Sequence, residues 1–497
     1  MTSVTPFVRR PQSPFVSSAR RARPRTCAPA LALGCLCIVA LLPSRSAWAQ
    51  TGPFFNEFAA TARSGALGQA FTGLADDASA AYYNPGGLGF APDQTYIGWH
   101  YAKPRLNLDY VDPAQPDVHF DIPPTRGLSV GAASPLAPQS VIDEFPWLAA
   151  LRWGGAVFLS LPEINSFTSY ADDTTPYFFR YDTRPDVISL AISAGWRVFD
   201  WLSIGAGIMG TVSSFQETEA NVRLPELICA VIENPPPQCV SDEPDPTKGL
   251  DLSLKQRLPL EMTPLVGILV KLPTPFLAAD SSVGFSWRGE IGNDFGTGPE
   301  TTSFGYRDPE TGLFVPLIPK PGQAPPVIPV INFIGYSPQQ FNFGIAVHPT
   351  SDLTLDLDGT YKLWETFRMF HRTKPDPAFE NRFVPRAGVE YRIPWVVEHW
   401  LLGLREVALR AGYTYEPTPN PSLGGRTNVL DSNQHVVSGG VGIGTRFIEA
   451  ANLTLDLFYQ YHLLADRSRT NDEDPAHGPY TISGDVWSVG MEGSVDW

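Results

Sequence analysis

Residues 453–463 read LTLDLFYQYHL, so apolar and polar side chains alternate along this stretch. The apolar set consists of Leu453, Leu455, Leu457, Tyr459 and Tyr461. The other set, which is mostly polar, consists of Thr454, Asp456, Phe458, Gln460 and His462. Successive side chains of a β-strand point to opposite faces. One face of the predicted strand therefore meets an apolar environment, while most side chains on the other face need water. Residues 353–363 and 407–416 repeat the pattern.

Alternation of this kind recurs over about 400 residues and predicts fourteen strands. We expect them at 94–110, 126–133, 153–161, 187–198, 202–216, 256–272, 281–292, 339–349, 353–370, 382–393, 405–417, 435–447, 453–465 and 484–497. A soluble sandwich also alternates, so the pattern alone leaves that fold open.

The lengths of the joins between these strands favour a membrane barrel. Short joins at 199–201, 350–352 and 448–452 alternate with long ones, which lie at 162–186, 217–255 and 293–338. Short periplasmic turns, long extracellular loops and an even number of strands are typical of outer-membrane barrels. We therefore predict an all-β fold, a transmembrane antiparallel β-barrel of about 14 strands, with both termini periplasmic.

The N-terminus has the layout of a secretory signal peptide. An arginine-rich start is followed by an apolar run over 28–42 and by Ala47-Trp48-Ala49. A lipoprotein signal ending at Cys35 is the alternative, with little apolar sequence before the cysteine. We expect residues 1–49 to be the signal peptide, 50–92 a plug, or hatch, inside the lumen, and 93–497 the barrel.

The charge of the mature chain argues against a nucleic-acid partner. The full chain has a net charge of −15, and cleavage after residue 49 would remove seven arginines and no acidic residue, which leaves −22. A polyanion of this kind does not seek nucleic acid. No apolar run after residue 49 reaches the roughly 18 residues that a membrane helix needs.

The segment before the first predicted strand is rich in alanine, glycine and serine and ends in a proline-glycine turn. Its motifs, in order, are Asn56-Glu57-Phe58, Gly65-Ala66-Leu67-Gly68, Ala75-Asp76-Asp77-Ala78 and Asn84-Pro85-Gly86-Gly87. In these residues the chain resembles the FadL/TodX family of outer-membrane channels for fatty acids and aromatic hydrocarbons, whose mature N-terminus forms a hatch inside the barrel. The family usually has alanine where this chain has Gly86. The resemblance implies a gate formed by Asp76, Asp77, Asn84, Pro85, Gly86 and Gly87.

A second candidate site is a loop that is too apolar for ordinary exposure. Residues 313–334 carry many aliphatic and aromatic side chains interrupted by prolines. Large exposed apolar patches usually mark binding surfaces, although the loop would also suit a cap folded over the barrel. The family resemblance favours ligand capture, because its members use the loops after the fifth and seventh strands for this purpose. The predicted substrate-binding residues are Leu313, Phe314, Leu317, Ile318, Ile328, Phe333 and Phe458.

Two cysteines, Cys229 and Cys239, remain after the predicted signal peptide. An oxidising exterior favours a disulfide between them. A contribution to a metal site is the alternative, but neither a Cys-x-x-Cys motif nor a nearby histidine supports it. We expect no metal and no cofactor.

Two short motifs imitate those of enzymes. Residues 205–210 match a dinucleotide-binding fingerprint, and residues 127–131, centred on Ser129, match a nucleophile elbow. Both patterns require a strand that ends in a turn followed by a helix, whereas here the strand alternation continues. We therefore expect close-packed barrel glycines at 205–210 and no enzymatic activity; an outer-membrane lipase acting through Ser129 is the less favoured alternative.

These patterns predict a multi-pass protein of the outer membrane of a Gram-negative bacterium. We expect a monomer that contacts outer-membrane lipid and lipopolysaccharide and passively admits hydrophobic small molecules, either long-chain fatty acids or aromatic hydrocarbons. The alternative from another class is a structural or adhesive surface barrel. A general porin is less compatible with a plugged N-terminus.

Overall fold

The computed structural model describes residues 54–120, 122, 124–160, 176–181, 188–212, 215–222, 250–257, 260–274, 277, 280–292, 303–307, 314–316, 336–368, 374–397, 404–424, 429–448, 451–469 and 478–497. The predicted signal peptide and both cysteines of the predicted disulfide lie outside these ranges.

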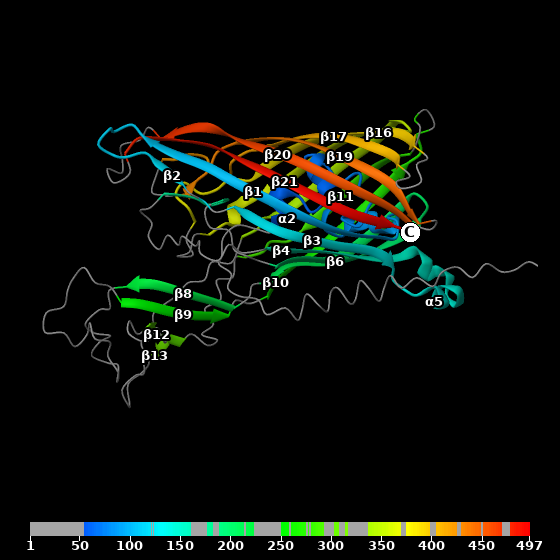
Figure 1. Cartoon of the computed structure of the whole chain (residues 1–497), viewed down its shortest axis with the longest axis horizontal. Helices are drawn as coiled ribbons and strands as arrows, with labels where there is room; N and C mark the ends of the chain where they lie inside the picture. Colours follow the sequence, from blue (N-terminus) through cyan, green and yellow to red (C-terminus); the bar gives the residue numbers. More distant parts are fainter. Residues whose placement is uncertain are drawn as a thin grey trace, which may run out of the picture. The chain divides into compact units, whose positions relative to one another are not determined.

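A closed antiparallel barrel of fourteen strands dominates the structure (Figure 1). Around the barrel the strands are β1 (Gln94–Tyr110), β21 (Tyr480–Asp496), β20 (Ala451–Arg469), β19 (Gln434–Ile448), β17 (Leu404–Glu416), β16 (Arg382–Val397), β15 (Leu353–Leu363), β14 (Gln339–Thr350), β11 (Ser281–Arg288), β10 (Leu260–Leu272), β7 (Leu202–Val212), β6 (Ile188–Phe199), β4 (Leu151–Ser160) and β3 (Thr125–Pro135). The first strand closes the ring, because Trp99 lies opposite both Met491 of β21 and Leu128 of β3. The predicted fold class is confirmed.

Smaller elements lie in the connections and at the N-terminus. Strand β2 (Val118–Phe120) pairs with β1; β8 (Phe215–Val222), β9 (Leu250–Arg257), β12 (Ser303–Arg307) and β13 (Phe314–Pro316) form a four-stranded sheet; and β5 (Tyr177–Phe178) pairs in parallel with β18 (Val429–Leu430). The helical elements are α2 (Phe54–Phe58), α3 (Ala62–Ala66), α4 (Ala80–Tyr83), η1 (Pro85–Gly89), α5 (Gln139–Glu144), η2 (Pro146–Ala150) and η3 (Trp364–Thr366). Among the described residues, no helix is both long enough and apolar enough to span a membrane.

The barrel wall has the two faces that the alternation predicts. On β20, Leu455 and Leu457 are 51% and 58% exposed, whereas Asp456 and Phe458 between and after them are 5% and 4% exposed. On β17, Leu409 and Tyr413 face outward while Arg410 is buried. The outer surface is therefore apolar and the lumen holds the polar groups, which is the arrangement of a barrel in lipid.

Three predicted strands run into a neighbouring element, and the ends of the others differ from the structure by up to four residues. The predicted strand 353–370 ends at Leu363, where η3 begins. The predicted strands 202–216 and 256–272 each combine two strands: Leu260 of β10 lies opposite Val212 of β7, and Arg257 of β9 lies opposite Phe215 of β8. The hairpin thus continues in the same register beyond the barrel, and alternation alone does not mark where the barrel strand stops.

The hydrophobic core lies between the barrel wall and the N-terminal segment. Phe55, Phe58, Phe71 and Tyr82 from this segment are buried in one cluster with wall residues such as Phe158. Figure 1 shows the blue N-terminal segment surrounded by the strands. We use the name hatch for residues 54–92, the described part of this segment.

A charged substitution tests the assignment of the outer face. We expect Leu457→Lys on β20 to lower the free energy of unfolding in lipid vesicles by about 2–4 kcal/mol, because a cation on the lipid face near mid-membrane is costly, and Leu453→Lys beside the turn to lower it by at most about 1 kcal/mol. Denaturant titrations of both variants measure the difference. Equal losses at the two positions would contradict a lipid-facing surface.

Candidate functional site

The hatch lies directly against the barrel wall because glycines leave space for its backbone. A Cβ atom added at Gly412 would lie 2.2 Å from the nitrogen of Gly68, and one at Gly284 would lie 2.0 Å from the carbonyl oxygen of Thr72. The wall glycines that meet hatch backbone in this way are Gly195, Gly205, Gly284, Gly344, Gly388 and Gly412. Gly205 belongs to the dinucleotide-like motif, so its role here is close packing against Pro85.

Wall side chains satisfy the backbone of the hatch. Six donors from five strands bond to hatch carbonyl oxygens in the pairs Ser193–Ala81, Ser282–Gly73, Ser286–Tyr83, Thr414–Gly68, Ser438–Ala66 and Gln460–Gly65. In the opposite direction, the Asp358 carboxylate accepts from the nitrogens of Phe71 and Thr72 at 2.9 and 2.6 Å. Each neutral bond of this kind contributes only about 0.5–1.5 kcal/mol net, and each bond to the carboxylate about 1.5–3 kcal/mol. The hatch is therefore held by many small contributions that water can replace.

The predicted gate residues at the end of the hatch form one compact turn. The Asn84 side chain caps η1 by accepting from the nitrogen of Gly86 at 3.0 Å, and it donates to the carbonyl oxygens of Thr72 and Ile268, each at 3.0 Å. Asn84 thus ties the turn both to the hatch and to β10. A Cβ atom on Gly86 would lie 2.7 Å from the nitrogen of Leu269. A larger residue at position 86 would therefore force the turn or the backbone of β10 to shift.

The other two predicted gate residues, Asp76 and Asp77, bind an arginine that the sequence analysis did not single out. Arg63 Nη1 donates to Asp76 Oδ1 at 2.6 Å and to Asp77 Oδ2 at 3.3 Å, while Nε donates to Glu390 Oε2 of β16 at 2.9 Å. Burial raises the pKa of Asp77 to about 6 despite the lowering effect of Arg63. Burial opposes the charge on Arg63, but Asp76, Glu390 and Asp77 outweigh it and raise its pKa well above the ordinary value.

Glu390 is also the centre of a charge network in the wall. Its Oε2 accepts from Arg410 Nε at 2.6 Å, and its Oε1 accepts from Arg392 Nη2 at 2.8 Å. Arg410 in turn donates to Asp456 on β20. Charged side chains on the lumen face of β16, β17 and β20 therefore pair with one another, and Glu390 pairs with the hatch as well.

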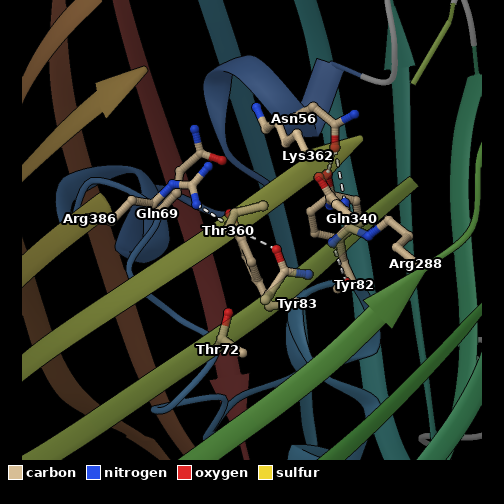
Figure 2. Close-up of a pocket in the computed structure, with 11 residues that line it drawn as sticks. Asn56, Gln69, Thr72, Tyr82, Tyr83, Arg288, Gln340, Thr360, Lys362 and Arg386 are labelled. Atoms are coloured by element: carbon tan, nitrogen blue, oxygen red, sulfur yellow. Dashed lines mark hydrogen bonds between the residues drawn. The ribbon is translucent and has the colours of Figure 1, made fainter. Parts of the chain in front are cut away.

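A small polar cavity lies between the hatch and strands β11, β14, β15 and β16 (Figure 2). Its volume is about 30 Å³, and its wall side carries three cationic side chains, Arg288, Lys362 and Arg386. At roughly 10–15 Å³ per water molecule, the cavity has room for about two waters. Burial raises the pKa of Tyr82 and Tyr83 on the hatch side, so both phenols stay neutral.

The three cations of this cavity have different partners. Lys362 Nζ donates to Glu416 Oε1 at 2.7 Å. Arg288 donates to the neutral oxygens of Asn56 and Tyr82 at 3.0 and 2.9 Å, and Arg386 donates to Thr360 Oγ1. Within the part of the chain that the structure describes, Arg386 Nε has no hydrogen-bond partner. Two of the three cations, Arg288 and Arg386, thus donate hydrogen bonds to neutral oxygens, although Arg386 also interacts electrostatically with the carboxylates of Asp358 and Glu416.

Only two of the predicted substrate-binding residues, Phe458 and Phe314, lie within the described residues. Phe458 is buried beneath the hatch, against Ala62 and Ala66. Phe314 begins β13, where it pairs with Arg307. The remaining residues of the predicted set lie outside the described residues; they are Leu313, Leu317, Ile318, Ile328 and Phe333.

The serine of the elbow-like motif has a histidine neighbour that the sequence did not reveal. His100 Nε2 lies 2.9 Å from Ser129 Oγ, with both side chains fully buried. Ser129 lies within β3, which pairs with β1 and β4 on either side, so the strand-to-helix turn of a nucleophile elbow is not formed. The His100 ring packs against Phe158 and Phe458. We assign the pair to packing in the lumen.

The structure was compared with known proteins. It is similar to a FadL homologue of Pseudomonas aeruginosa, with a TM-score of 0.49 and 17% identity over 91% of this chain and 98% of that chain. It resembles FadL-type channels in fold. The toluene transporter TodX of P. putida gives 0.47 and 14% identity over 87% and 97%, and the toluene transporter TbuX of Ralstonia pickettii gives 0.38 and 12% over 86% and 96%. No family model matches this sequence, and no curated protein matches it.

Proposed function

We propose that this protein is an outer-membrane channel for the passive uptake of hydrophobic small molecules. The observation that carries the proposal is a barrel with an apolar outer face whose lumen is filled by its own N-terminal segment. A plug held by many small contacts suits a passage that opens for a ligand and otherwise stays shut. We place the chain in the outer membrane of a Gram-negative bacterium, as a monomer among lipid and lipopolysaccharide.

We propose the pair Arg63–Glu390 as the latch of the gate, together with Asp76, Asp77 and the turn 84–87. Separating hatch from wall at this pair leaves Arg63 with its two hatch carboxylates, and Glu390 with Arg410 and Arg392. A buried charge that loses its only partner costs several kcal/mol. Because Arg63 and Glu390 each keep an ion-pair partner when they separate, the latch can open repeatedly without leaving a buried charge unpaired.

The cationic cavity favours a ligand with a carboxylate over an uncharged hydrocarbon. A carboxylate presents two oxygens, which matches a space for about two waters, and arginine recognises carboxylates through paired donors. The cavity is too small for a hydrocarbon tail, so we infer that it receives the headgroup while the tail follows the path opened by the hatch. Long-chain fatty acids are the ligand class that this arrangement favours.

We further propose that the loop 313–334 captures ligand at the cell surface and that Cys229 and Cys239 form a disulfide in the loop after β8. Burying hydrocarbon contributes about 0.8 kcal/mol per CH₂, so an apolar loop can concentrate a fatty acid before it enters. Residues 1–49 are proposed as the cleaved signal peptide, 50–92 as the hatch and 93–497 as the barrel.

Uptake of labelled oleate tests the proposal. A Gram-negative host that lacks its own fatty-acid transporter is given this chain, and insertion is checked in isolated outer membranes. We expect saturable uptake that falls to the level of the host after deletion of 313–334. Folded, inserted protein without oleate uptake would reject the fatty-acid proposal, and uptake of toluene in its place would support the aromatic alternative.

A further inference from the structure

A short segment between β4 and β6 crosses the lumen at the end opposite the turn 84–87. Arg180 in this segment reaches Glu416 at the end of β17, and Tyr181 reaches Gln434 at the start of β19. Phe178 packs on Phe120 of β2, which pairs with β1, whereas Phe179 packs on Trp364 directly after β15. In the closed ring, β1 and β15 lie six strands apart, where seven is the greatest separation possible. Residues 176–181, which we call the mouth segment, therefore contact nearly opposite sides of the barrel.

Arg180 anchors the mouth segment with ion pairs in a buried position. Its side chain is 2% exposed, its Nη1 lies 3.1 Å from Glu416 Oε1, and its Nε lies 3.2 Å from Asp431 Oδ1. Burial disfavours the charged guanidinium, but Asp431 and Glu416 outweigh this effect and raise the pKa of Arg180. The charge is therefore retained, and withdrawing Arg180 would cost two buried ion pairs.

Aromatic and backbone contacts fix the residues before Arg180. Phe179 is buried in a cluster with Tyr336, Trp364, Phe367 and Phe379, which lie beside the ends of β14, β15 and β16. The Phe178 ring packs edge to face on Phe120, with 5.2 Å between centroids. Strand β5 adds a parallel backbone pairing with β18, in which Tyr177 lies opposite Val429.

The mouth segment is linked to both the cavity and the hatch. Glu416 Oε1 accepts from Arg180 and also from Lys362, which lines the cavity. Arg180 Nη1 also lies 4.0 Å from Glu57 Oε2 in the hatch helix α2. The cavity thus borders the hatch, and its lining residue Lys362 shares the partner Glu416 with Arg180 of the mouth segment.

We propose that the mouth segment is a second closure, in series with the hatch, and that Arg180 is the residue that holds it. The hatch closes the passage from the side of the turn 84–87, the mouth segment closes it from the side of the long loops, and the cavity lies between the two. The inference rests on the proposed function and deepens it, because a ligand must release two separate closures to pass.

Ion conductance of the purified full-length chain in planar lipid bilayers, measured in potassium chloride, tests the proposal without any hydrophobic ligand. The variants are Arg180→Gln, the hatch-displacing Gly412→Ala, and the two combined. For closures in series, we expect each single variant to stay within about twofold of the wild type and the double variant to exceed either by about tenfold or more. Arg382→Gln is the matched control, since Arg382 forms an ion pair with Glu380 at 2.6 Å near the rim and does not contact the mouth segment.

Two results would overturn the proposal: a double variant no more conductive than Gly412→Ala alone, or Arg180→Gln alone as conductive as the double variant. If Arg180→Gln does not fold, cysteines replacing Tyr177 and Val429 provide a second test. These residues are directly paired, and neighbouring strands are close enough for a disulfide. Reducing the engineered disulfide in a combined Arg180→Lys and Gly412→Ala protein, in which Cys229→Ser and Cys239→Ser remove the proposed native disulfide, must raise conductance if the segment is a closure. An unchanged conductance refutes the closure even if oleate uptake is intact.

Discussion

Gly412→Ala is expected to release the hatch from the wall while leaving the barrel folded. The added methyl group would lie 2.2 Å from the backbone of Gly68 and of Leu67, and backbone cannot yield as a flexible side chain does. Overpacking of this kind costs about 1–3 kcal/mol, which corresponds to a shift of about 5- to 150-fold in the equilibrium between seated and released hatch. Arg63 is the only lysine or arginine between residues 54 and 92, so tryptic cleavage after Arg63 reports hatch release.

The control for this experiment is the same substitution at Gly439. A Cβ atom there would meet only the carbonyl oxygen of Arg410, at an ordinary 3.6 Å. We expect the rate of cleavage after Arg63, followed by mass spectrometry in detergent, to rise by about 10-fold or more for Gly412→Ala and to stay unchanged for Gly439→Ala. Equal rates in both variants, with both barrels intact, would show that the wall glycines do not seat the hatch.

The barrel could be predicted from sequence because its determinants are local. The alternation of 453–463 assigns each side chain to a face, and no distant residue is needed to read it. The hatch was predicted from the order of its motifs, and the turn at 84–87 ends the preceding helix as the Asn-Pro pair suggests, since Asn84 caps the following η1. Local patterns failed where a strand continued past the barrel, as at Val212.

The residues that hold the lumen shut could not be predicted in the same way, because their contacts join distant parts of the chain. Arg63 and Glu390 are separated by 327 positions, and Arg180 and Glu416 by 236. One signal was available for the first pair: Arg63 is the only basic residue in a hatch with three acidic residues. No comparable signal marks Arg180, which lies in a long connection without a clear strand pattern. The proposed role of Arg180 follows only from the folded protein, in which the mouth segment reaches Glu416 of β17.

We expect Arg386→Gln to weaken the uptake of fatty acids without changing the uptake of uncharged hydrocarbons. Arg386 lines the cavity, donates to Thr360, and keeps Nε without a partner among the described residues, so it has a donor available for a carboxylate. A hydrogen bond to a charged group contributes about 1.5–3 kcal/mol. We therefore expect the concentration of oleate that gives half-maximal uptake to rise by about 10- to 100-fold, while uptake of toluene, if the channel admits it, stays unchanged.

The selectivity of this loss distinguishes a headgroup site from a structural role. If Arg386 only stabilised the lumen, its replacement would reduce oleate and toluene uptake together, and the variant would unfold at a lower denaturant concentration. Arg382→Gln, on the same strand but outside the cavity lining, controls for the loss of one arginine from β16. A normal oleate response in Arg386→Gln would exclude this side chain from carboxylate recognition and leave Arg288 as the cation to test. Carboxylate recognition then depends on a residue that also binds Tyr82 of the hatch, so headgroup binding and hatch release would be coupled through one side chain.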